Sequence, residues 1–588
     1  MDLSAILNNV QDDEARQGGA KGEAGTGRTT DTNQSQARLL CLPAELYDPI
    51  ISYLSNQDIK SLRLTCTFLH SVARLRLSRV FISANQRDVQ VLQAIANSEE
   101  FRLGVTELIW DDARFGHDVD HEDADSEADD EGGDDEHVPQ WFQDACDDNI
   151  DELNSRKGLD ADGPEHLARA QQLNARLPSA VCWANYQKLL REQDALLTSG
   201  ADEAAFRHAL QRFPSLKRVT ITPAAHGWLF CPLYETPTIR VLPHGFNYPI
   251  PRGWPTTPDG DPPRRMPPWP ADGDGEAYKE QWHGIRVALR VLADPGVDHS
   301  ITELILDAHS LDTGLNCRIF EGPSTASPAA PPNREYAHLC ALLRRPRFAH
   351  LDLALAVGGQ EHLGWPALRG APHLLRAALA GAEGMRHFSL RTNVIPDPDA
   401  RATEPGSGGC AEHHVPLAGL VPVAAGAGAT TGAWPRLEHL GLSGLLVTQA
   451  DVAALLLGAP ATLRSAELSF LHFLDGGGSF RGLLGELRGP PGWRSRARPR
   501  PALSVGHALI VPRCGRAVWA RREAVDGFLY GEGPNPFGGE GSFAPNQIVM
   551  GGGAGVERDA FDPSHERPYT DNISLMRLGV LKKAPWLE

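Results

Sequence analysis

Seven segments of this 588-residue chain share the pattern Leu-x-x-Leu-x-Leu, with other apolar residues in place of some leucines. Apolar and polar residues alternate in each, which predicts a half-buried β-strand. A helical pattern precedes several of them. One strand and one helix cannot bury their own apolar faces, so we expect the units to stack around one core with a parallel sheet. The predicted strands are Val105–Trp110, Leu216–Ile221, Ile301–Leu306, Phe348–Leu353, Met385–Leu390, Leu437–Leu442 and Leu463–Leu468, and the predicted helices are Ala204–Gln211, Gly284–Leu292, Tyr336–Leu343, Leu374–Leu379 and Val452–Leu457.

One strand and one helix per unit, with this strand pattern, resembles leucine-rich repeats. The resemblance implies a fold of the α+β or α/β class, in which an irregular strand–helix solenoid occupies residues 81–520. The strand segments follow one another at intervals from about 26 to over 80 residues, whereas regular repeats of this class are roughly 20 to 29 residues long. A non-repeating α/β domain therefore remains an alternative.

Long insertions explain the uneven spacing. We expect an acidic disordered insertion at 116–138, a Pro-rich insertion at 232–275 and a Gly/Pro/Ala-rich loop at 395–432, with an irregular C-terminal segment at 521–588. Aromatic residues are interspersed in the Pro-rich insertion, and four of them either contact a substrate or pack over the end of the body. These are Phe246, Tyr248, Trp254 and Trp269. A further amphipathic helix is predicted from Tyr186 to Leu197.

The N-terminal part has a different pattern. Residues 1–37 are polar and predict a disordered tail, whereas 38–80 predict a compact helical module. Asp48-Pro49 is typical of an N-cap followed by the first helical residue, and Asp58 is suited to cap the next helix. Apolar residues recur at helical spacing along both helices, including Leu64 and Phe68 in a second stripe. A module of roughly 40 residues buries little apolar surface, so it requires a partner or the body behind it.

The module resembles an F-box. The resemblance rests on Leu42-Pro43-x-Glu45-Leu46, Ile50-Ile51-x-Tyr53-Leu54 and Asp58-Ile59-x-x-Leu62-Arg63-Leu64-Thr65-Cys66, followed by Phe68. Pro49 departs from the family pattern because most members have an ordinary helix former there. Weaker similarity to F-box proteins of filamentous fungi extends to Trp110–Arg114 and Gly531–Phe537. The resemblance implies that a Skp-type adaptor, and through it a cullin, docks on Leu42, Pro43, Leu46, Ile50, Ile51, Leu54, Ile59 and Leu62.

Most of the net negative charge of the chain comes from one segment. The run from Asp118 to Glu136 contains 12 acidic residues and no Lys or Arg, and without it the formal charge of −19 becomes −7. Such a run is usually a solvated loop, although a basic partner could bind it. The chain lacks the basic patch that a nucleic-acid-binding protein needs, so we expect no nucleic acid as a partner.

The scattered cysteines and the lack of long apolar runs indicate an intracellular protein. Nine cysteines are scattered without any Cys-x-x-Cys pair, which is atypical of a disulfide framework or a zinc site. Cys66 is expected to be a buried apolar residue. The N-terminus lacks a signal-peptide core, and no run of about 18 apolar residues occurs. We therefore expect a cytoplasmic or nuclear protein that does not enter the membrane.

The sequence contains no recognisable catalytic motif, so we expect no catalytic residue, metal or cofactor. Cys410, His413 and His414 include zinc-binding residue types, but they lie in a loop-like insertion without a fourth ligand at useful spacing. Three histidines precede strand leucines at equivalent positions, which predicts surface-facing strand residues that contact a ligand if they line the inner sheet. They are His350, His387 and His439.

The leading hypothesis is a non-catalytic substrate receptor of an SCF-type (Skp, cullin, F-box) ubiquitin ligase. The module would bind the adaptor, and the repeat-like body would bind a protein substrate. The alternative is an F-box scaffold that recruits no cullin. An enzyme in the α/β body has no supporting motif.

Overall fold

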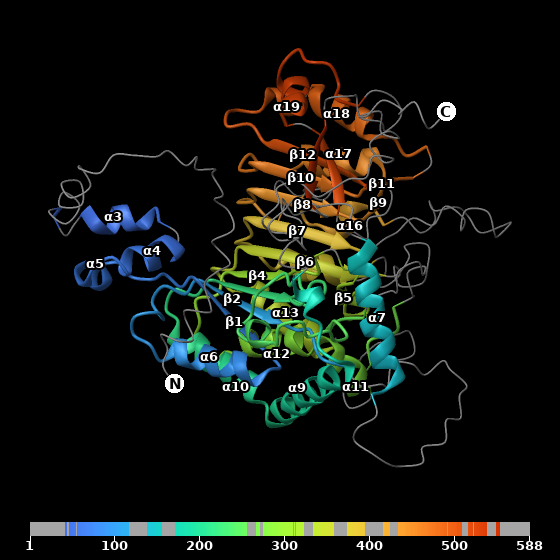
Figure 1. Ribbon diagram of the computed structural model, residues 1–588. Helices are drawn as coiled ribbons and strands as arrows, with labels where there is room; N and C mark the ends of the chain where they lie inside the picture. Colours follow the sequence, from blue (N-terminus) through green and yellow to red (C-terminus); the bar gives the residue numbers. More distant parts are fainter. Residues whose placement is uncertain are drawn as a thin grey trace, which may run out of the picture.

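The N-terminal helices form a small group beside the main body of the molecule (Figure 1). The computed structural model describes residues 42–43, 46–54, 56–116, 138–155, 171–255, 266–270, 275–309, 311, 313–322, 333–357, 368, 373–393, 415–423, 433–474, 476–490, 492–508, 516–520, 522–537 and 548–552. The group consists of α3 (Tyr47–Ser52), α4 (Asn56–Arg63) and α5 (Thr67–Val72). The predicted tail at 1–37 lies outside the described residues.

A mostly parallel sheet runs through the body, and its strands are neighbours in nearly the order in which they occur in the chain. Pairing is parallel from β1 to β12 and antiparallel from β12 to β13 and from β13 to β14, while β5 pairs with β6 off the main path. The strands are β1 (Arg79–Ser83), β2 (Glu107–Asp111), β3 (Arg218–Thr222), β4 (Glu303–Leu306), β5 (Leu315–Asn316), β6 (His350–Ala356), β7 (His387–Thr392), β8 (His439–Ser443), β10 (Ser465–Ser469), β12 (Ala502–Ala508), β13 (Arg516–Ala520) and β14 (Ile548–Gly552). A separate pair joins β9 (Leu446–Val447) to β11 (His472–Phe473).

The helices form a layer in which each packs against the next, in the order α6, α10, α12, α13, α15, α16, α17, α18 and α19. Their apolar residues join the strand leucines in one continuous core. The layer contains α6 (Gln86–Ala96), α10 (Ala201–Arg212), α12 (His283–Ala293), α13 (Arg334–Leu343), α15 (Leu374–Ala380), α16 (Leu417–Leu420), α17 (Gln449–Leu457), α18 (Phe480–Arg488) and α19 (Arg522–Tyr530). The remaining helices are α7 (Gln140–Ser155), α9 (Ser179–Ser199) and α11 (Glu276–Lys279), with short 3-10 turns at Ile239–Val241, Glu280–Trp282, Cys317–Phe320 and Trp493–Ser495.

Alternation along the strands separates a leucine face from a polar face. On β7, Phe388 and Leu390 are buried in the core, whereas His387, Ser389 and Arg391 are half-buried on the opposite side. Successive side chains of a strand point to opposite faces, so this pattern follows directly from the sequence. We call the side that carries His387 the polar face.

The structure confirms the positions of the seven predicted strands and of the predicted helices. Sequence reasoning missed β1 and α6, and β1 begins inside the range assigned to the helical module. It also missed regular structure near the C-terminus. Within the range 521–588, expected to be irregular, α19 packs against β12 and β14 pairs with β13. The helix α16 lies within the predicted loop 395–432, whose other described residues are few. Most of the acidic insertion 116–138 lies outside the described residues.

The described part of the Pro-rich insertion is packed against the body. Phe246 and Tyr248 stack with ring centroids 4.7 Å apart, and both side chains are buried. The indole of Trp254 is also buried and donates to the Asp112 carboxylate at 2.8 Å. Trp269 is partly buried and packs against Trp282. Of the two alternatives for these aromatic residues, packing is therefore the one that the structure supports.

Candidate functional site

The three N-terminal helices have a core of their own. Five buried residues form it, and none of them belongs to the core of the body. Leu75 packs against this small core, while Leu77 is part of the body core, so the boundary between the two lies in the connecting segment. The five residues are Tyr47, Ile51, Ile59, Leu69 and Ala73.

Hydrogen bonds hold the connecting segment against the helices. The buried Asn56 amide donates to the Arg76 carbonyl at 2.8 Å and accepts from the Arg76 amide at 2.9 Å. The Arg76 guanidinium donates to the Ser52 carbonyl at 2.8 Å, at the end of α3. Arg63 donates to the Ala73 carbonyl at 2.8 Å. These contacts fix where the chain leaves the module and enters β1.

The eight residues predicted to bind an adaptor differ in their exposure. Pro43, Leu46 and Ile50 are exposed, Leu42, Leu54 and Leu62 are half-buried, and Ile51 and Ile59 are buried. Ile59 has no exposed surface and Ile51 only 6%, because their side chains form the module core. In this structure these two side chains belong to the module core and contribute little or nothing to its surface.

Three other apolar residues of the module are also exposed. Leu64 is 87% exposed and Phe68 is 44% exposed, although both were placed in an apolar stripe of the bundle. Tyr53 is 90% exposed at the end of α3. Leu46, Ile50 and Tyr53 follow each other at intervals of four and three residues, which places them on one side of the helix. We call these three residues the α3 stripe.

The helix starts also differ from the sequence prediction. The helix α3 begins at Tyr47, so Pro49 occupies the first turn, where the missing N–H has no intrahelical partner to lose. The helix α4 begins at Asn56, so Asp58 lies in its first turn and does not occupy the N-cap position. Cys66 is half-buried and caps α5, because its Sγ accepts from the Leu69 amide at 3.5 Å.

A row of polar residues crosses the polar face in register, one from each of β1, β2, β3, β4, β6, β7, β8 and β10. Arg79 on β1 pairs with Glu107 at 2.8 Å, and Arg218 on β3 pairs with Glu303 at 2.6 Å. The row then changes from arginine and glutamate to histidine. In sheet order it contains Arg79, Glu107, Arg218, Glu303, His350, His387, His439 and Ser465. At the β1 end the face is covered, since the Tyr234 ring lies 6.2 Å from the Phe81 ring.

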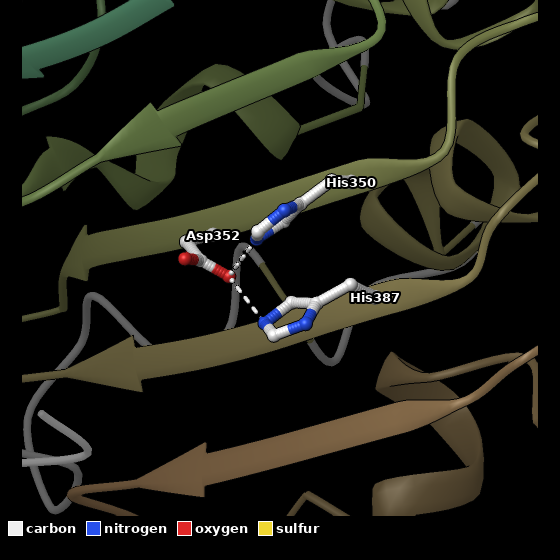
Figure 2. A group of neighbouring side chains, drawn as sticks. All are labelled: His350, Asp352 and His387. Atoms are coloured by element: carbon white, nitrogen blue, oxygen red, sulfur yellow. Dashed lines mark hydrogen bonds and ion pairs between the residues drawn. The ribbon is translucent and has the colours of Figure 1, made fainter. Parts of the chain in front are cut away.

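The three histidines predicted to lie at equivalent strand positions are stacked. The ring centroids of His350 and His387 are 3.8 Å apart, and those of His387 and His439 are 4.1 Å apart. Asp352 lies two residues beyond His350 on β6, and its carboxylate contacts the rings of both His350 and His387 (Figure 2). Its Oδ1 lies 3.1 Å from His350 Nε2 and 3.3 Å from His387 Nε2. The His439 ring bonds the Ser465 hydroxyl at 2.8 Å instead.

Burial and contacts with neighbouring charged groups shift the pKa values of the titratable side chains in this row. Burial disfavours the charged form of His350, but the Asp352 and Glu303 carboxylates outweigh it and raise the pKa to about 9. The His350 contact lowers the pKa of Glu303 to about 2. Burial raises the pKa of Asp352, but its bonds to the two imidazoles outweigh that and lower it. Burial and the neighbouring His387 lower the pKa of His439 to about 4.

Within the described residues, one group of His, Cys, Asp and Glu side chains has donor atoms close enough together to hold a metal ion, namely His350, Asp352 and His387. Sequence reasoning noted both histidines but not Asp352. The group Cys410, His413 and His414 lies outside the described residues. Among the described residues, no helix combines the length and apolar character that crossing a membrane requires.

No protein-family model matches this chain, and a comparison with curated proteins also finds no match.

Proposed function

We propose that this protein is a non-catalytic substrate receptor of an SCF-type ubiquitin ligase, working in the cytoplasm or nucleus. The N-terminal helices would bind a Skp-type adaptor, and the α/β body would bind a protein substrate. The F-box-like sequence of residues 42–68 suggested this function. The observation that carries it is the α3 stripe, an exposed apolar surface on helices whose core is separate from the body.

Exposed apolar side chains on a small helical module favour a protein partner. Tyr53 and Leu64 leave most of their surface in water, and Ile50 leaves 39% of its surface there. The module core contains only five buried residues, so docking on an adaptor would add apolar burial that the chain itself does not supply. The contacts of Asn56 and Arg76 would then transmit the position of the adaptor to the body.

Such a receptor needs no catalytic residue of its own. Holding a substrate beside a charged conjugating enzyme raises the effective concentration of its lysines, which accelerates transfer by proximity. The polar face of the sheet is the surface that we assign to the substrate, because half-buried histidine, aspartate and arginine side chains lie there and not leucines.

Reconstitution tests the proposal. The full chain is co-expressed with a Skp-type adaptor and a cullin–RING pair, and the complexes are separated by size exclusion. We expect the adaptor and the cullin to co-elute with the chain, and proteins bound to the body to be polyubiquitinated. The Ile50→Asp variant should no longer co-elute with the adaptor or the cullin. The control is Leu103→Asp, which changes an exposed leucine of the body and should still co-elute with both. Adaptor binding without cullin would instead favour the scaffold function, and equal adaptor recovery with Ile50→Asp would refute docking on α3.

A further inference from the structure

We propose that His350, Asp352 and His387 form a binding site for a zinc ion on the polar face of the sheet. The parallel register makes the site: His350 on β6 and His387 on β7 are direct partners, and Asp352 lies two residues further along β6 on the same face. All three donor atoms lie within 4.8 Å of one another. This inference concerns the body and does not depend on the ligase function.

The two separations that involve Asp352 fit a four-coordinate ion. Ligands about 2.0–2.1 Å from zinc at tetrahedral angles lie roughly 3.3 Å apart. Asp352 Oδ1 is 3.1 Å from His350 Nε2 and 3.3 Å from His387 Nε2, and Figure 2 shows both rings directed at this oxygen. Two imidazoles and one carboxylate are a ligand set that binds zinc, as in metalloenzymes with a His₂-carboxylate site.

A neighbouring carboxylate orients one ligand. His350 Nδ1 lies 3.5 Å from Glu303 Oε2, and Arg218 holds Glu303 at 2.6 Å. A carboxylate at Nδ1 favours the neutral tautomer that carries its proton on Nδ1, which leaves the Nε2 lone pair for a metal, and such carboxylate–histidine–zinc arrangements strengthen zinc binding. The Arg218–Glu303 pair, on the neighbouring strands β3 and β4, therefore holds the His350 ring in the orientation that zinc binding requires.

The site is accessible, and among the described residues no lysine or arginine contacts its carboxylate. The side chains of His350, Asp352 and His387 are 15%, 28% and 34% exposed. In the described part of the chain, Asp352 contacts the two imidazoles but no lysine or arginine, unlike Glu107 and Glu303 in the same row. Three protein ligands on an accessible face leave the fourth zinc position for water or for a group of a bound partner.

Metal binding by the purified full chain tests the proposal. The protein is stripped with EDTA, dialysed and titrated with ZnCl₂ by calorimetry, and bound metal is counted by mass spectrometry. We expect one zinc ion per chain. Asp352→Asn and His387→Gln should each abolish measurable binding, and Glu303→Gln should weaken it by roughly 10- to 100-fold. Tetrahedral Co²⁺ absorption should appear with the wild-type chain and disappear with Asp352→Asn.

Two controls separate this site from other zinc ligands. His208→Gln changes a histidine on α10, remote in sequence from the site, and should leave zinc affinity unchanged. The triple substitution Cys410→Ser, His413→Gln and His414→Gln should also retain the zinc. Loss of zinc in the triple variant, equal affinity in wild type and Asp352→Asn, or no zinc binding by folded wild-type protein would each overturn the proposal. The last result would identify the group as a metal-free stack held by the hydrogen bonds of Asp352.

Discussion

Replacing two residues of the α3 stripe should weaken adaptor binding without unfolding the module. Tyr53 is 90% exposed and Ile50 is 39% exposed, and neither is among the residues that form the module core or the partly buried residues packed against it. Full burial of a large apolar side chain contributes about 1.5–3 kcal/mol. Scaled by exposure, complete coverage by an adaptor would contribute about 1 kcal/mol at Ile50 and about 2 kcal/mol at Tyr53.

The double variant Ile50→Ser/Tyr53→Ser should therefore lose about 3 kcal/mol of binding free energy, which corresponds to a roughly 100-fold higher Kd. Calorimetric titration of the full chain with a purified Skp-type adaptor measures it. Circular dichroism should show unchanged helix content, because both changes are on the surface. Ile59→Ala, a change in the module core, should instead destabilise the helices by about 2–5 kcal/mol.

A body residue provides the matched control. Leu103 is 53% exposed, comparable to the stripe residues, and belongs to the segment between α6 and β2. Leu103→Ser should leave the Kd within about twofold of wild type, because Leu103 lies outside the α3 stripe. A tenfold change in Kd would require a change of about 1.4 kcal/mol in binding free energy. A double variant that binds the adaptor within threefold of wild type would refute docking on α3, and an equal loss with Leu103→Ser would refute its specificity.

Two further predictions concern the body. Burial disfavours the charged form of His283, but carboxylates led by Asp202, 2.6 Å away, outweigh it and raise the pKa to about 9. A raised folded-state pKa stabilises the protein fully below the unfolded value near 6.5, and the contribution is lost as pH rises through 9. The stability difference between wild type and His283→Gln, measured by denaturant unfolding, should therefore shrink by about 3 kcal/mol from pH 6 to pH 10; a constant difference would contradict the ion pair. Gly444 has a φ of +65°, and a Cβ there would collide with the Thr392 carbonyl oxygen. Gly444→Ala should lower Tm more than Gly200→Ala, because Gly200 has a φ of +63° but open space around it, so an alanine there costs only the left-handed backbone strain of about 1–2 kcal/mol. Equal losses would exclude the collision.

The strands of the body were predictable because their sequence alternates. At β7, His387, Ser389 and Arg391 alternate with Phe388 and Leu390, so one face is apolar and the other polar, and both the element and its buried side follow. The strand β1 was missed because Val80, Phe81 and Ile82 are all buried, and a short continuous apolar run does not distinguish a strand from a buried helix.

The histidine group was only partly predictable. Equivalent positions in successive units identified His350, His387 and His439, because parallel strands in register bring such positions together. Asp352 lies two residues after His350 and therefore shares its face, which is the signal that would have added it. The orientation of the imidazoles toward one carboxylate oxygen depends on rotamers and on the register of β6 with β7, which the sequence does not specify.

The exposure of Leu64 and Phe68 could not be predicted for a related reason. Helical periodicity places Leu64 and Phe68 on an apolar stripe, but α4 and α5 are only eight and six residues long and cannot enclose every apolar residue of two stripes. Periodicity shows that a face is apolar; whether the chain or a partner covers that face depends on how much of the molecule packs against it.

The two proposed sites can be altered independently because they belong to different cores. The α3 stripe lies on helices that pack around Tyr47 and Ile59, whereas His350 and His387 lie on strands whose leucines pack in the body core. In the described part of the chain, the segment held by Asn56 connects the two cores. Adaptor binding and zinc binding therefore rest on separate contacts, and a variant that abolished both would indicate loss of the fold and not loss of a site.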